Sequence, residues 1–403
     1  MEPIDRRELL RRGLLAGLGL ALPAAPDAGA GEDVPRVRRR VRLGRTGLEI
    51  PDVGFGSSRL AGDVDVVRHA LDRGITYFDT AESYTRGMSE ETLGRALAGR
   101  REEVVLATKT HCNADSSADG LMRALEASLR RLRTDRVEIY LNHAVNDPAR
   151  LRNPAWPEFV QRARREGKIR FAGMSGHGGR LVECLDLAVD EGLVDVVLVA
   201  HNFGQDPAFH ERFTGRLDLV AVQPDLPRVL RKARARGIGV VAMKTLRGAR
   251  LNDMRPYEMD GASFAQAALR WVLASGLADA LVVTMESPAA VDEYLGASGW
   301  TRLARGDTPL LTRYESLQGA IQCRYGCRAC EGACLAAVSI PDALRARMYA
   351  EDYGDLVLAR ESGAGIGAAA QACLACAARP CLAACPHGLP IAELTSRAAT
   401  LLA

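Results

Sequence analysis

Four polar residues that can move or orient a proton lie just after short apolar runs in the first part of the chain: Asp79, Tyr84, Lys109 and His143. A tyrosine hydroxyl is normally a weak acid, with a pKa of about 10. A neighbouring lysine ammonium would lower that pKa, and a carboxylate such as Asp79 would hold the lysine charged and in place. A histidine beside them would donate to a substrate oxygen. The set favours proton transfer to a carbonyl oxygen as hydride arrives at the carbon.

Lysine is rare in this sequence, which makes its positions informative. Lysine and arginine together number 53, but only four of these residues are lysines. Two of them, Lys109 and Lys244, follow apolar runs, which indicates a need for a compact ammonium that a guanidinium cannot supply. Taken singly, Asp79 could cap a helix, Tyr84 could pack on a loop and His143 could be a core histidine. Their joint placement favours the catalytic interpretation.

The elements that must position these residues are eight strand–helix pairs between Val53 and about Ser298. β-Branched apolar runs alternate there with amphipathic helical patterns. The predicted strands are Val53–Ser58, Tyr77–Ala81, Val104–Lys109, Arg136–His143, Arg170–Gly176, Val194–Asn202, Gly239–Thr245 and Ala280–Met285. Eight such units predict an α/β fold, a (β/α)8 TIM barrel with its site at the carboxyl ends of the strands. A doubly wound sheet is the alternative, but no glycine-rich dinucleotide turn follows the first strand.

Three helical patterns between the strands are well marked: Ser89–Ala98, Asp119–Arg133 and Ala262–Ser275. We expect Ser89 to cap the first of them. Upstream, two short apolar runs at residues 41–43 and 48–50 flank a Gly-Arg-Thr-Gly turn, which predicts a hairpin that plugs the barrel floor. The basic run Arg36–Arg42 is interpreted as a solvated linker.

The sequence around the polar residues resembles the aldo/keto reductase family. The matching segments are GITYFDTAESY at 74–84, SEETLGRAL at 89–97, ATK at 107–109 and DRVEIYLNH at 135–143. The resemblance covers about residues 41–298. It implies that Asp79, Tyr84, Lys109 and His143 form a catalytic tetrad with Tyr84 as general acid, and that NADP(H) or NAD(H) lies across the strand ends. The residues that it places at the cofactor are Ser175, Asn202, Met243, Lys244, Ser287 and Glu293.

The last predicted strand departs from the family pattern. The family usually has a glycine, a small hydroxyl residue and a basic residue for the 2′-phosphate, whereas residues 284–288 read Thr-Met-Glu-Ser-Pro and no Lys or Arg occurs between Ala280 and Gly299. Tyr294 also replaces the asparagine that commonly follows the carboxylate. Either NAD(H) is accepted as readily as NADP(H), or nicotinamide binding has weakened.

Eight of the ten cysteines form two quartets near the carboxyl terminus. They are Cys323, Cys327, Cys330 and Cys334, then Cys373, Cys376, Cys381 and Cys385. These spacings, and the Cys-Pro that ends the second quartet, resemble a bacterial ferredoxin with two [4Fe–4S] clusters. The resemblance implies that the first three cysteines of each quartet share a cluster with the last cysteine of the other. Two details depart from that pattern: the spacing between the first two cysteines is longer than usual, and Leu335 replaces a proline. Two zinc sites or a disulfide framework are the alternative interpretations.

Other cysteines and histidines lie near predicted strand ends. Cys184 is expected in the core, and Cys112, close to Lys109, is a candidate for an exposed thiol at the site. His111, His177 and His201 are interpreted as loop histidines with satisfied hydrogen bonds.

The first thirty residues have the features of a signal peptide. An arginine-rich start at residues 6–12 precedes an apolar run at 13–25 and an Ala-Gly-Ala cleavage site at 28–30. The paired arginines resemble a twin-arginine signal, which implies export of the folded protein to the periplasm by the twin-arginine machinery. The apolar run is too short for a stable membrane span. A leader that is never cleaved is the alternative.

Composition and domain order complete the prediction. The chain has 403 residues, 47% of them hydrophobic, which excludes disorder, and its net charge of +3 gives no reason to expect a nucleic-acid partner. We expect a signal peptide (1–30), a linker (31–40), the barrel (41–298), a connecting helical segment (299–322) and a mainly helical ferredoxin-like domain (323–403).

The predicted function is that of an exported oxidoreductase of the aldo/keto reductase type. It would act on a small carbonyl or alcohol substrate, and its clusters would either exchange electrons with a protein partner or only hold the tail together. The alternative is an iron–sulfur electron-transfer or cofactor-carrier protein with a catalytically silent barrel.

Overall fold

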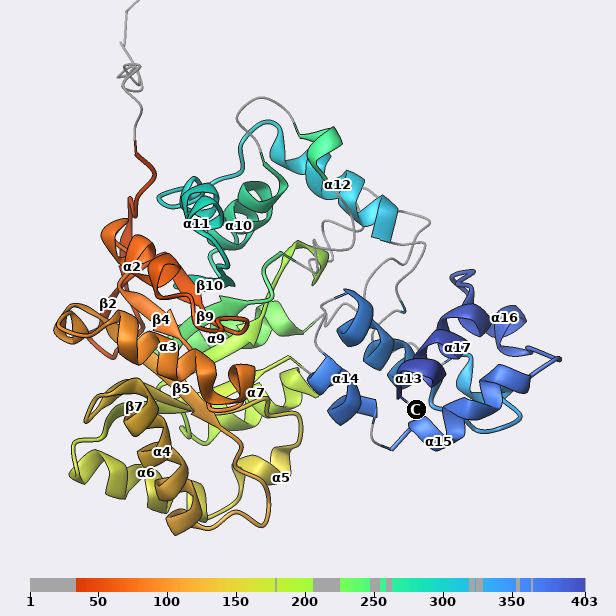
Figure 1. Ribbon diagram of the computed structural model, residues 1–403, viewed down its shortest axis with the longest axis horizontal. Helices are drawn as coiled ribbons and strands as arrows, with labels where there is room; N and C mark the ends of the chain where they lie inside the picture. The colour runs from red at the N-terminus through yellow and green to blue at the C-terminus, as the bar shows by residue number, and fades with distance from the viewer. Residues whose placement is uncertain are drawn as a thin grey trace, which may run out of the picture. The chain divides into compact units, whose positions relative to one another are not determined.

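The computed structural model describes residues 34–177, 180–205, 225–246, 254–258, 263–318, 323, 329–352, 356–363 and 365–402. Eight parallel strands close into a barrel in the order β10-β3-β4-β5-β6-β7-β8-β9 (Figure 1). They are β3 (Val53–Gly56), β4 (Tyr77–Asp79), β5 (Val105–Thr110), β6 (Val137–Asn142), β7 (Ile169–Gly176), β8 (Val196–Ala200), β9 (Gly239–Met243) and β10 (Ala280–Thr284). The predicted (β/α)8 barrel is confirmed, and every predicted strand overlaps an observed one.

Helices follow the strands along the chain and pack on the barrel's outer surface (Figure 1). They are α2 (Val64–Asp72), α3 (Met88–Ala96), α4 (Ala118–Leu132), α5 (Pro148–Leu151), α6 (Ala155–Arg165), α7 (Leu181–Asp190), α9 (Leu226–Ala235), α10 (Phe264–Ala274) and α11 (Pro288–Leu295). Because helices cover the outer face and side chains fill the interior, the strands are buried on both faces, and this explains their continuous apolar runs.

The predicted cap of α3 is wrong. The helix begins at Met88 after Gly87, whose φ is 88°, so that Ser89 lies inside the first turn. The buried Ser89 hydroxyl instead lies 2.9 Å from the carbonyl oxygen of Ser57 and 2.8 Å from the hydroxyl of Thr80. These contacts join the loops after β3 and β4 to the helix, so Ser89 supports the strand ends instead of capping.

The predicted hairpin closes the barrel floor. Strands β1 (Arg40–Arg42) and β2 (Glu49–Pro51) pair antiparallel, and Leu43 and Ile50 are fully buried among side chains that fill the barrel interior. Gly44 packs so closely that a Cβ atom there would lie 2.4 Å from the carbonyl oxygen of Gly237. The barrel is therefore closed by its own amino-terminal segment.

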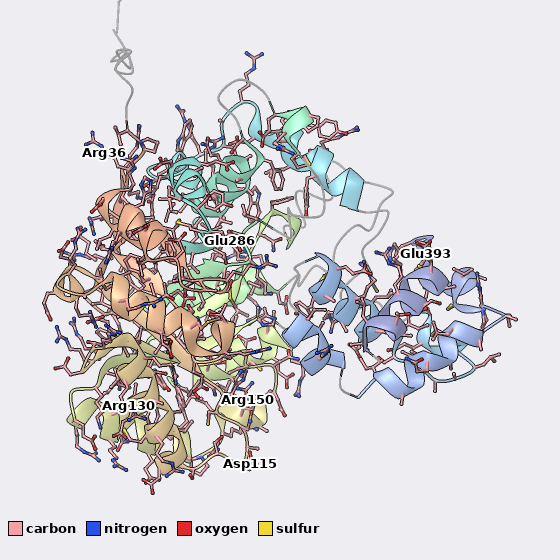
Figure 2. The ribbon with its side chains drawn as sticks, viewed as in Figure 1. Arg36, Asp115, Arg130, Arg150, Glu286 and Glu393 are labelled. Carbon is pink, nitrogen blue, oxygen red and sulfur yellow. The ribbon has the colours of Figure 1, made fainter. Side chains whose placement is uncertain are left out.

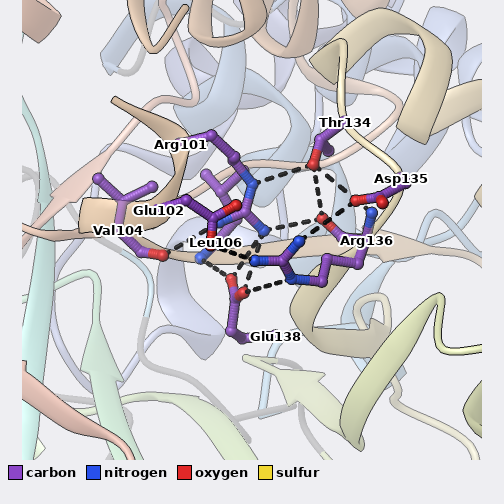
Figure 3. A network of polar contacts seen from close by, with 8 residues as sticks. All are labelled: Arg101, Glu102, Val104, Leu106, Thr134, Asp135, Arg136 and Glu138. Atoms are coloured by element: carbon purple, nitrogen blue, oxygen red, sulfur yellow. Dashed lines mark hydrogen bonds and ion pairs between the residues drawn. The ribbon is translucent and has the colours of Figure 1, made fainter. Parts of the chain in front are cut away.

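A polar network fixes the register of β5 and β6, the strands that lead to Lys109 and His143. The guanidinium of Arg101 donates to the carbonyl oxygen of Arg136 at 2.8 Å and to Oε2 of Glu138 at 3.0 Å (Figure 3). Glu138 in turn accepts from the backbone N–H of Leu106 at 2.8 Å. The Glu138 carboxylate thus links β5 to β6 near the start of both strands. Because each strand continues without a break, this link also aligns their carboxyl ends, where Lys109 and His143 lie.

The part of the chain that follows the barrel is mainly helical where it is described. Its helices are α12 (Asp307–Gln318), α13 (Ile340–Arg347), α14 (Leu356–Gly363), α15 (Gly367–Ala370), α16 (Cys381–Ala384) and α17 (Ile391–Leu402), with a π-helical turn, η7, at Met348–Asp352. A small separate core that includes Val338, Ile340, Leu389 and Leu394 joins α13, α15 and α17, whereas Leu310 and Leu311 of α12 belong to the core of the barrel. The predicted helical content is confirmed, and the ferredoxin likeness stays a prediction.

The predicted signal peptide lies outside the described residues. Residues Met1–Val34 and Pro35–Ala403 are two separate units, and Val34 is the part of the first that the structure describes. In the described chain, no helix has both the length and the apolar character needed to cross a bilayer.

Candidate active site

The barrel brings Asp79, Tyr84, Lys109 and His143 together at the carboxyl ends of neighbouring strands. Asp79 ends β4, Lys109 lies near the end of β5, and His143 directly follows β6. The β5 and β6 strands pair with Lys109 opposite Leu141, which leaves His143 beyond the last paired residue. Tyr84 opens a single 3-10 turn, η1 (Tyr84–Gly87), after β4. The predicted assembly of these four side chains is therefore present.

The Lys109 ammonium is the centre of this group. Its side chain is fully buried, and Nζ lies 2.8 Å from Oδ2 of Asp79, 2.6 Å from the carbonyl oxygen of Thr80 and 3.4 Å from the hydroxyl of Tyr84. An ammonium has three hydrogens to donate, and three acceptors surround it. Its charge also lies 4.7 Å from the centre of the Tyr84 ring. The arrangement favours a negative charge on the Tyr84 oxygen.

Burial and pairing act in opposite directions on this ion pair. Burial by itself would lower the pKa of Lys109, but the charges of Asp79 and Tyr84 and their hydrogen bonds raise it above its usual value. Burial raises the pKa of Asp79, and Lys109 opposes that rise. The lysine is therefore kept charged at neutral pH by its carboxylate partner, as the residue types predicted.

The ring of His143 also contacts Tyr84. The two rings meet edge to face with centroids 5.6 Å apart, and the His111 ring lies 4.7 Å from that of His143. Burial lowers the pKa of His143 well below its usual value, and the positive charge of Lys109 lowers it further. The imidazole is thus neutral near pH 7 and can donate one hydrogen bond to a substrate oxygen without adding a proton to the reaction.

A strained turn holds Tyr84 over the lysine. The two residues after it, Thr85 and Arg86, have φ values of 47° and 58°, and Gly87 follows at 88°. The left-handed region is unfavourable for Thr and Arg, so tertiary contacts must hold this turn. One such contact is the Thr85 hydroxyl, which donates to the carbonyl oxygen of Leu60 at 2.8 Å. The sequence carries no signal for this turn.

A buried carboxylate beneath the site was missed by the sequence analysis. Glu90, in the first turn of α3, is fully buried and accepts from Nε of Arg131 at 2.6 Å. It also accepts from the hydroxyl of Thr108, the residue before Lys109, at 2.5 Å. The pairing ties β5 to helices α3 and α4. The only available signal was a glutamate at a position where α3 faces the barrel.

The loop after His143 is held by an arginine from the short helix α5. Arg150 donates to the carbonyl oxygen of His143 at 2.7 Å, to that of Ala144 at 2.8 Å and to that of Cys112 at 2.8 Å (Figure 2 labels Arg150). One side chain therefore gathers the loops that follow β5 and β6. This contact fixes the backbone on which the imidazole is mounted.

Comparisons with known proteins agree with this geometry. A sequence profile described as the aldo/keto reductase family matches residues 52–256, just over half of the chain. The chain belongs to the aldo/keto reductase family. The matched residues include all four tetrad positions and end before β10 and the cysteine-rich tail.

The curated relatives cover the barrel only in part. The chain is 32% identical over 234 residues to the uncharacterized oxidoreductase YrpG of Bacillus subtilis, a match that covers 51% of this chain and 66% of that protein. It is 33% identical to YqkF of the same organism, over 48% of that protein. L-galactose dehydrogenase of Arabidopsis thaliana is 28% identical, with 63% of this chain and 86% of that protein covered. The chain thus spans about half to two thirds of the first two of these relatives.

Solved structures match the same region. An aldo-keto reductase from Klebsiella pneumoniae in complex with NADPH has a TM-score of 0.52 and 26% identity, covering 69% of this chain and 95% of that one. The aldo-keto reductase AKR11C1 from Bacillus halodurans has a TM-score of 0.54 at 20% identity, over 68% of this chain and 95% of that one, which shows a shared fold.

The family places the cofactor residues at the ends of the later strands, and the structure shows what those residues contact. The hydroxyl of Ser175, at the end of β7, accepts from the backbone N–H of Ala144 at 2.9 Å. The Asn202 side chain donates to the carbonyl oxygen of Lys244 at 3.2 Å. Met243 ends β9, and Lys244, which follows with φ 56°, has Nζ 5.5 Å from the centre of the Tyr349 ring. All four lie at the strand ends, and their roles toward a cofactor stay predictions.

The two remaining cofactor candidates lie on α11. Ser287 caps the helix by accepting from the backbone N–H of Ala290 at 3.2 Å, and Glu293 lies within the helix, where its carbonyl oxygen accepts from Gln266 at 2.9 Å. Glu286, labelled in Figure 2, lies 3.7 Å from a guanidinium nitrogen of Arg59. A basic residue therefore stands near this loop, supplied by the segment after β3 and not by the last strand, where the sequence analysis looked for it.

One buried atom tests whether the site fits a nicotinamide cofactor. The Oδ1 oxygen of Asp79 is buried and has no hydrogen-bond partner in the described chain, although Oδ2 is paired with Lys109. A buried carboxylate oxygen normally accepts a hydrogen bond. A ribose hydroxyl would supply one, so the residues present fit the cofactor that the family implies.

Two expectations about residues near strand ends are wrong. Cys112 is fully buried, and burial raises the pKa of its thiol. The chain turns inward after β5, where the Cys112 N–H donates to Oδ1 of Asn142 at 3.1 Å, so the thiol is not exposed at the site. His201 is also buried, but its Nδ1 has no hydrogen-bond partner in the described chain. Cys184 is buried in the core, as predicted.

The tail brings four predicted ligands together. Cys334, Cys373, Cys376 and Cys381 line one cavity of about 70 Å³. Burial raises the pKa of the Cys381 thiol, and the charges of the other three also raise it. Cys323, Cys330 and Cys385 pack against the same small core, while Cys327 lies outside the described residues. Every described cysteine is a free thiol, and no three His, Cys, Asp or Glu side chains in the described chain converge as ligands for one metal ion.

Proposed function

We propose that this protein is an NAD(P)-dependent oxidoreductase that interconverts a carbonyl compound and an alcohol. The observation that carries the proposal is the buried Lys109 ammonium, which lies between the Asp79 carboxylate at 2.8 Å and the Tyr84 hydroxyl at 3.4 Å. An exposed lysine would not alter the acidity of a tyrosine so strongly, because water screens its charge. Family membership and the relatives named as oxidoreductases support the same activity.

Each tetrad residue has a separate task in the proposed reaction. When bound, nicotinamide supplies or accepts the hydride. In the direction of reduction, Tyr84 donates its hydroxyl proton to the substrate oxygen, and Lys109 stabilises the resulting phenolate. His143, kept neutral by its surroundings, donates a hydrogen bond to the same oxygen and fixes its direction. Asp79 contacts neither the Tyr84 oxygen nor the substrate oxygen in this reaction, and it acts by holding Lys109 charged.

The form of the nicotinamide is part of the proposal. The Klebsiella pneumoniae relative binds NADPH, which supports NADP(H), whereas the last strand of this chain offers no basic residue of its own. We propose that both NADP(H) and NAD(H) are accepted, with Asp79 Oδ1 receiving a ribose hydroxyl. Titration of the purified protein with each cofactor, followed by fluorescence, measures the preference.

The activity is tested with a pair of tyrosine variants. Tyr84→Phe removes the proton donor and is expected to lower kcat for reduction of a panel of aldehydes and ketones by a factor of about 10² to 10⁴. Tyr257→Phe alters a tyrosine outside the tetrad, on the turn Arg255–Tyr257, and serves as the matched control. Equal turnover by Tyr84→Phe and wild type would remove the proposed role, and failure of both cofactors to bind would remove the proposed activity.

The four-cysteine cavity supports a second function, electron transfer by iron–sulfur clusters. We propose that Cys334, Cys373, Cys376 and Cys381 hold one [4Fe–4S] cluster and that Cys323, Cys327, Cys330 and Cys385 hold another. Four thiols line one cavity, and four cysteine thiolates are the ligand set of a [4Fe–4S] cluster. The clusters would pass electrons to a protein partner.

Metal analysis decides this second function. Anaerobically purified protein should contain about eight iron atoms per chain and absorb visible light, and Cys376→Ser should lose about half of the iron. Cys112→Ala, at a buried cysteine outside both quartets, should leave the iron content unchanged. A colourless protein that holds zinc would refute the clusters.

Export is proposed from residues 1–30 alone. A twin-arginine signal would deliver the folded protein, with its cofactors, to the periplasm. Replacing Arg6 and Arg7 by lysine should abolish export, whereas the same change at Arg11 and Arg12 should not. Secretion that persists in a host without the twin-arginine translocase would contradict the proposal.

A further inference from the structure

A second cavity lies between helices α9 and α10, and none of the four tetrad residues lines it. Its volume is about 350 Å³. The walls are mainly apolar, with Leu226 from the start of α9, Trp271 and Leu277 from the end of α10 and beyond, and Leu303. Three polar side chains also line it, His201, Arg231 and Ser275. Apolar walls with a few placed polar groups are typical of a small-molecule site.

The hydrogen bonds around His201 define which ring nitrogen carries hydrogen. Nε2 of His201 lies 3.3 Å from the hydroxyl oxygen of Ser275. That hydroxyl also lies 2.7 Å from the carbonyl oxygen of Val272, to which we assign its single hydrogen, so that it accepts from the ring. The hydrogen of the neutral imidazole is therefore on Nε2, and Nδ1 presents a lone pair.

This lone pair is unsatisfied. His201 is only 2% exposed, and its Nδ1 has no hydrogen-bond partner in the described chain. Burial also lowers the pKa of His201 to about 4, so the ring does not gain a proton near neutral pH. A buried acceptor without a partner is unusual in a native structure, and an O–H or N–H group of a ligand would satisfy it. The Trp271 ring, 5.1 Å from the imidazole centroid, offers a flat apolar surface beside it.

The second polar group is a cation without a carboxylate. Arg231 is exposed on α9 and forms no ion pair with a residue of the described chain. Its neighbours on the helix differ, because Arg228 and Lys232 both bind Asp186, at 2.6 Å and 2.9 Å. A guanidinium of this kind binds a carboxylate through two parallel hydrogen bonds.

We infer that this cavity binds a small aromatic carboxylate that carries a hydroxyl group. The carboxylate would lie on Arg231, the ring against Trp271, and the hydroxyl would donate to Nδ1 of His201. No tetrad residue takes part, so the inference stands or falls separately from the proposed activity.

Calorimetric titration of the full chain with the three hydroxybenzoate isomers, benzoate and phenol tests the site. At least one hydroxybenzoate should bind about tenfold more tightly than benzoate, which lacks the donor, and than phenol, which lacks the charge. Arg231→Gln, a surface change, should weaken that binding about tenfold, and Arg228→Gln should not. His201→Phe should remove the preference over benzoate.

Three results would overturn the inference. One is the absence of binding by every probe at about 10 mM, a concentration that detects even weak sites. Another is equal affinity for benzoate and all hydroxybenzoates in the wild type. The third is binding that survives Arg231→Gln but is lost in Tyr84→Phe, because the carboxylate would then occupy the tetrad site. If His201→Phe does not fold, the Arg231 and Arg228 variants still decide.

Discussion

Replacing Asp79 by asparagine tests whether the buried Lys109 ammonium depends on a single counter-charge. In the native protein, the Asp79 carboxylate neutralises the Lys109 ammonium through a contact of 2.8 Å between Oδ2 and Nζ. Its two other acceptors are the carbonyl oxygen of Thr80 and the hydroxyl of Tyr84. The substitution keeps the shape of the side chain and removes one negative charge, so a buried positive charge is left with neutral partners.

The expected loss of stability is large and depends on pH. Removing one partner of a buried ion pair lowers the free energy of unfolding by about 3–5 kcal/mol, because the remaining charge is uncompensated. Burial by itself lowers the pKa of Lys109, and Asp79 is the main group that raises it, so we expect this pKa to be lower in the folded variant than in the unfolded chain. Between those two pKa values the unfolded chain binds more protons than the folded one, and stability therefore rises with pH. The loss should be full at neutral pH and shrink as the pH rises through the lowered pKa.

Urea unfolding followed by circular dichroism, at about pH 6, 7.5 and 9, measures this dependence. Asp119→Asn removes a carboxylate from an exposed pair with Arg162, at 2.8 Å, and should unfold like the wild type. The double variant Asp79→Asn/Lys109→Met removes both charges and should recover much of the loss. A loss below about 1 kcal/mol, or the same loss at all three pH values, would refute the account of a buried and dependent ammonium.

Three further outcomes follow from the structure. Gly44→Ala should lower the unfolding free energy by at least about 2 kcal/mol, because its Cβ would lie 2.4 Å from the carbonyl oxygen of Gly237. Gly47→Ala, which is also at positive φ but has open space around it, should cost about 1 kcal/mol. Thermal melts of the two variants measure this difference. Glu90→Gln should cost about 1.5–3 kcal/mol in urea unfolding, since the buried carboxylate accepts from Arg131 and Thr108, and an unchanged midpoint would contradict its structural role. Burial lowers the pKa of His201 to about 4, so on acidification the unfolded chain takes up this proton before the folded one does. Between pH 7 and pH 5 the histidine should therefore lower the free energy of unfolding by about 2 kcal/mol. If a His201→Asn variant loses stability with pH as steeply as the wild type, this contribution of His201 is refuted.

The strands and the tetrad positions could be predicted because both follow from short-range patterns. A strand buried on both faces is mainly apolar, so a polar residue that closes such a run marks the strand's end, as Asp79 does for β4. In β6 the rule is weaker, because Glu138 and Asn142 lie within the strand that ends just before His143. Closure of the barrel then places those ends together without further information. The pairing of Lys109 with Asp79 follows from neighbouring strands and compatible charges.

The remaining contacts depend on residues distant in sequence or on unusual backbone geometry. Nothing in the local sequence places Thr85 and Arg86 at positive φ, because neither residue type favours it. The hydrogen bond between Glu90 and Arg131 joins α3 to α4 through two residues that are 41 positions apart in the sequence, and a single sequence does not reveal such a pair. Cys112 was misjudged for a related reason, since nearness to Lys109 along the chain says nothing about the side to which the loop turns.

The rarity of lysine has a geometric explanation at this site. An ammonium has three donors, and Lys109 meets three acceptors: the Asp79 carboxylate, the Thr80 carbonyl oxygen and the Tyr84 hydroxyl. Arginine is not excluded by burial, because Arg270 is only 2% exposed and its planar fork binds both oxygens of Asp307, at 2.9 Å and 2.6 Å. An arginine at position 109 would bring five donors to a site built for three and leave at least one buried donor unsatisfied. Lysine and arginine carry the same charge, so it is the number of acceptors around position 109 that favours lysine here, in a chain that uses arginine almost everywhere else.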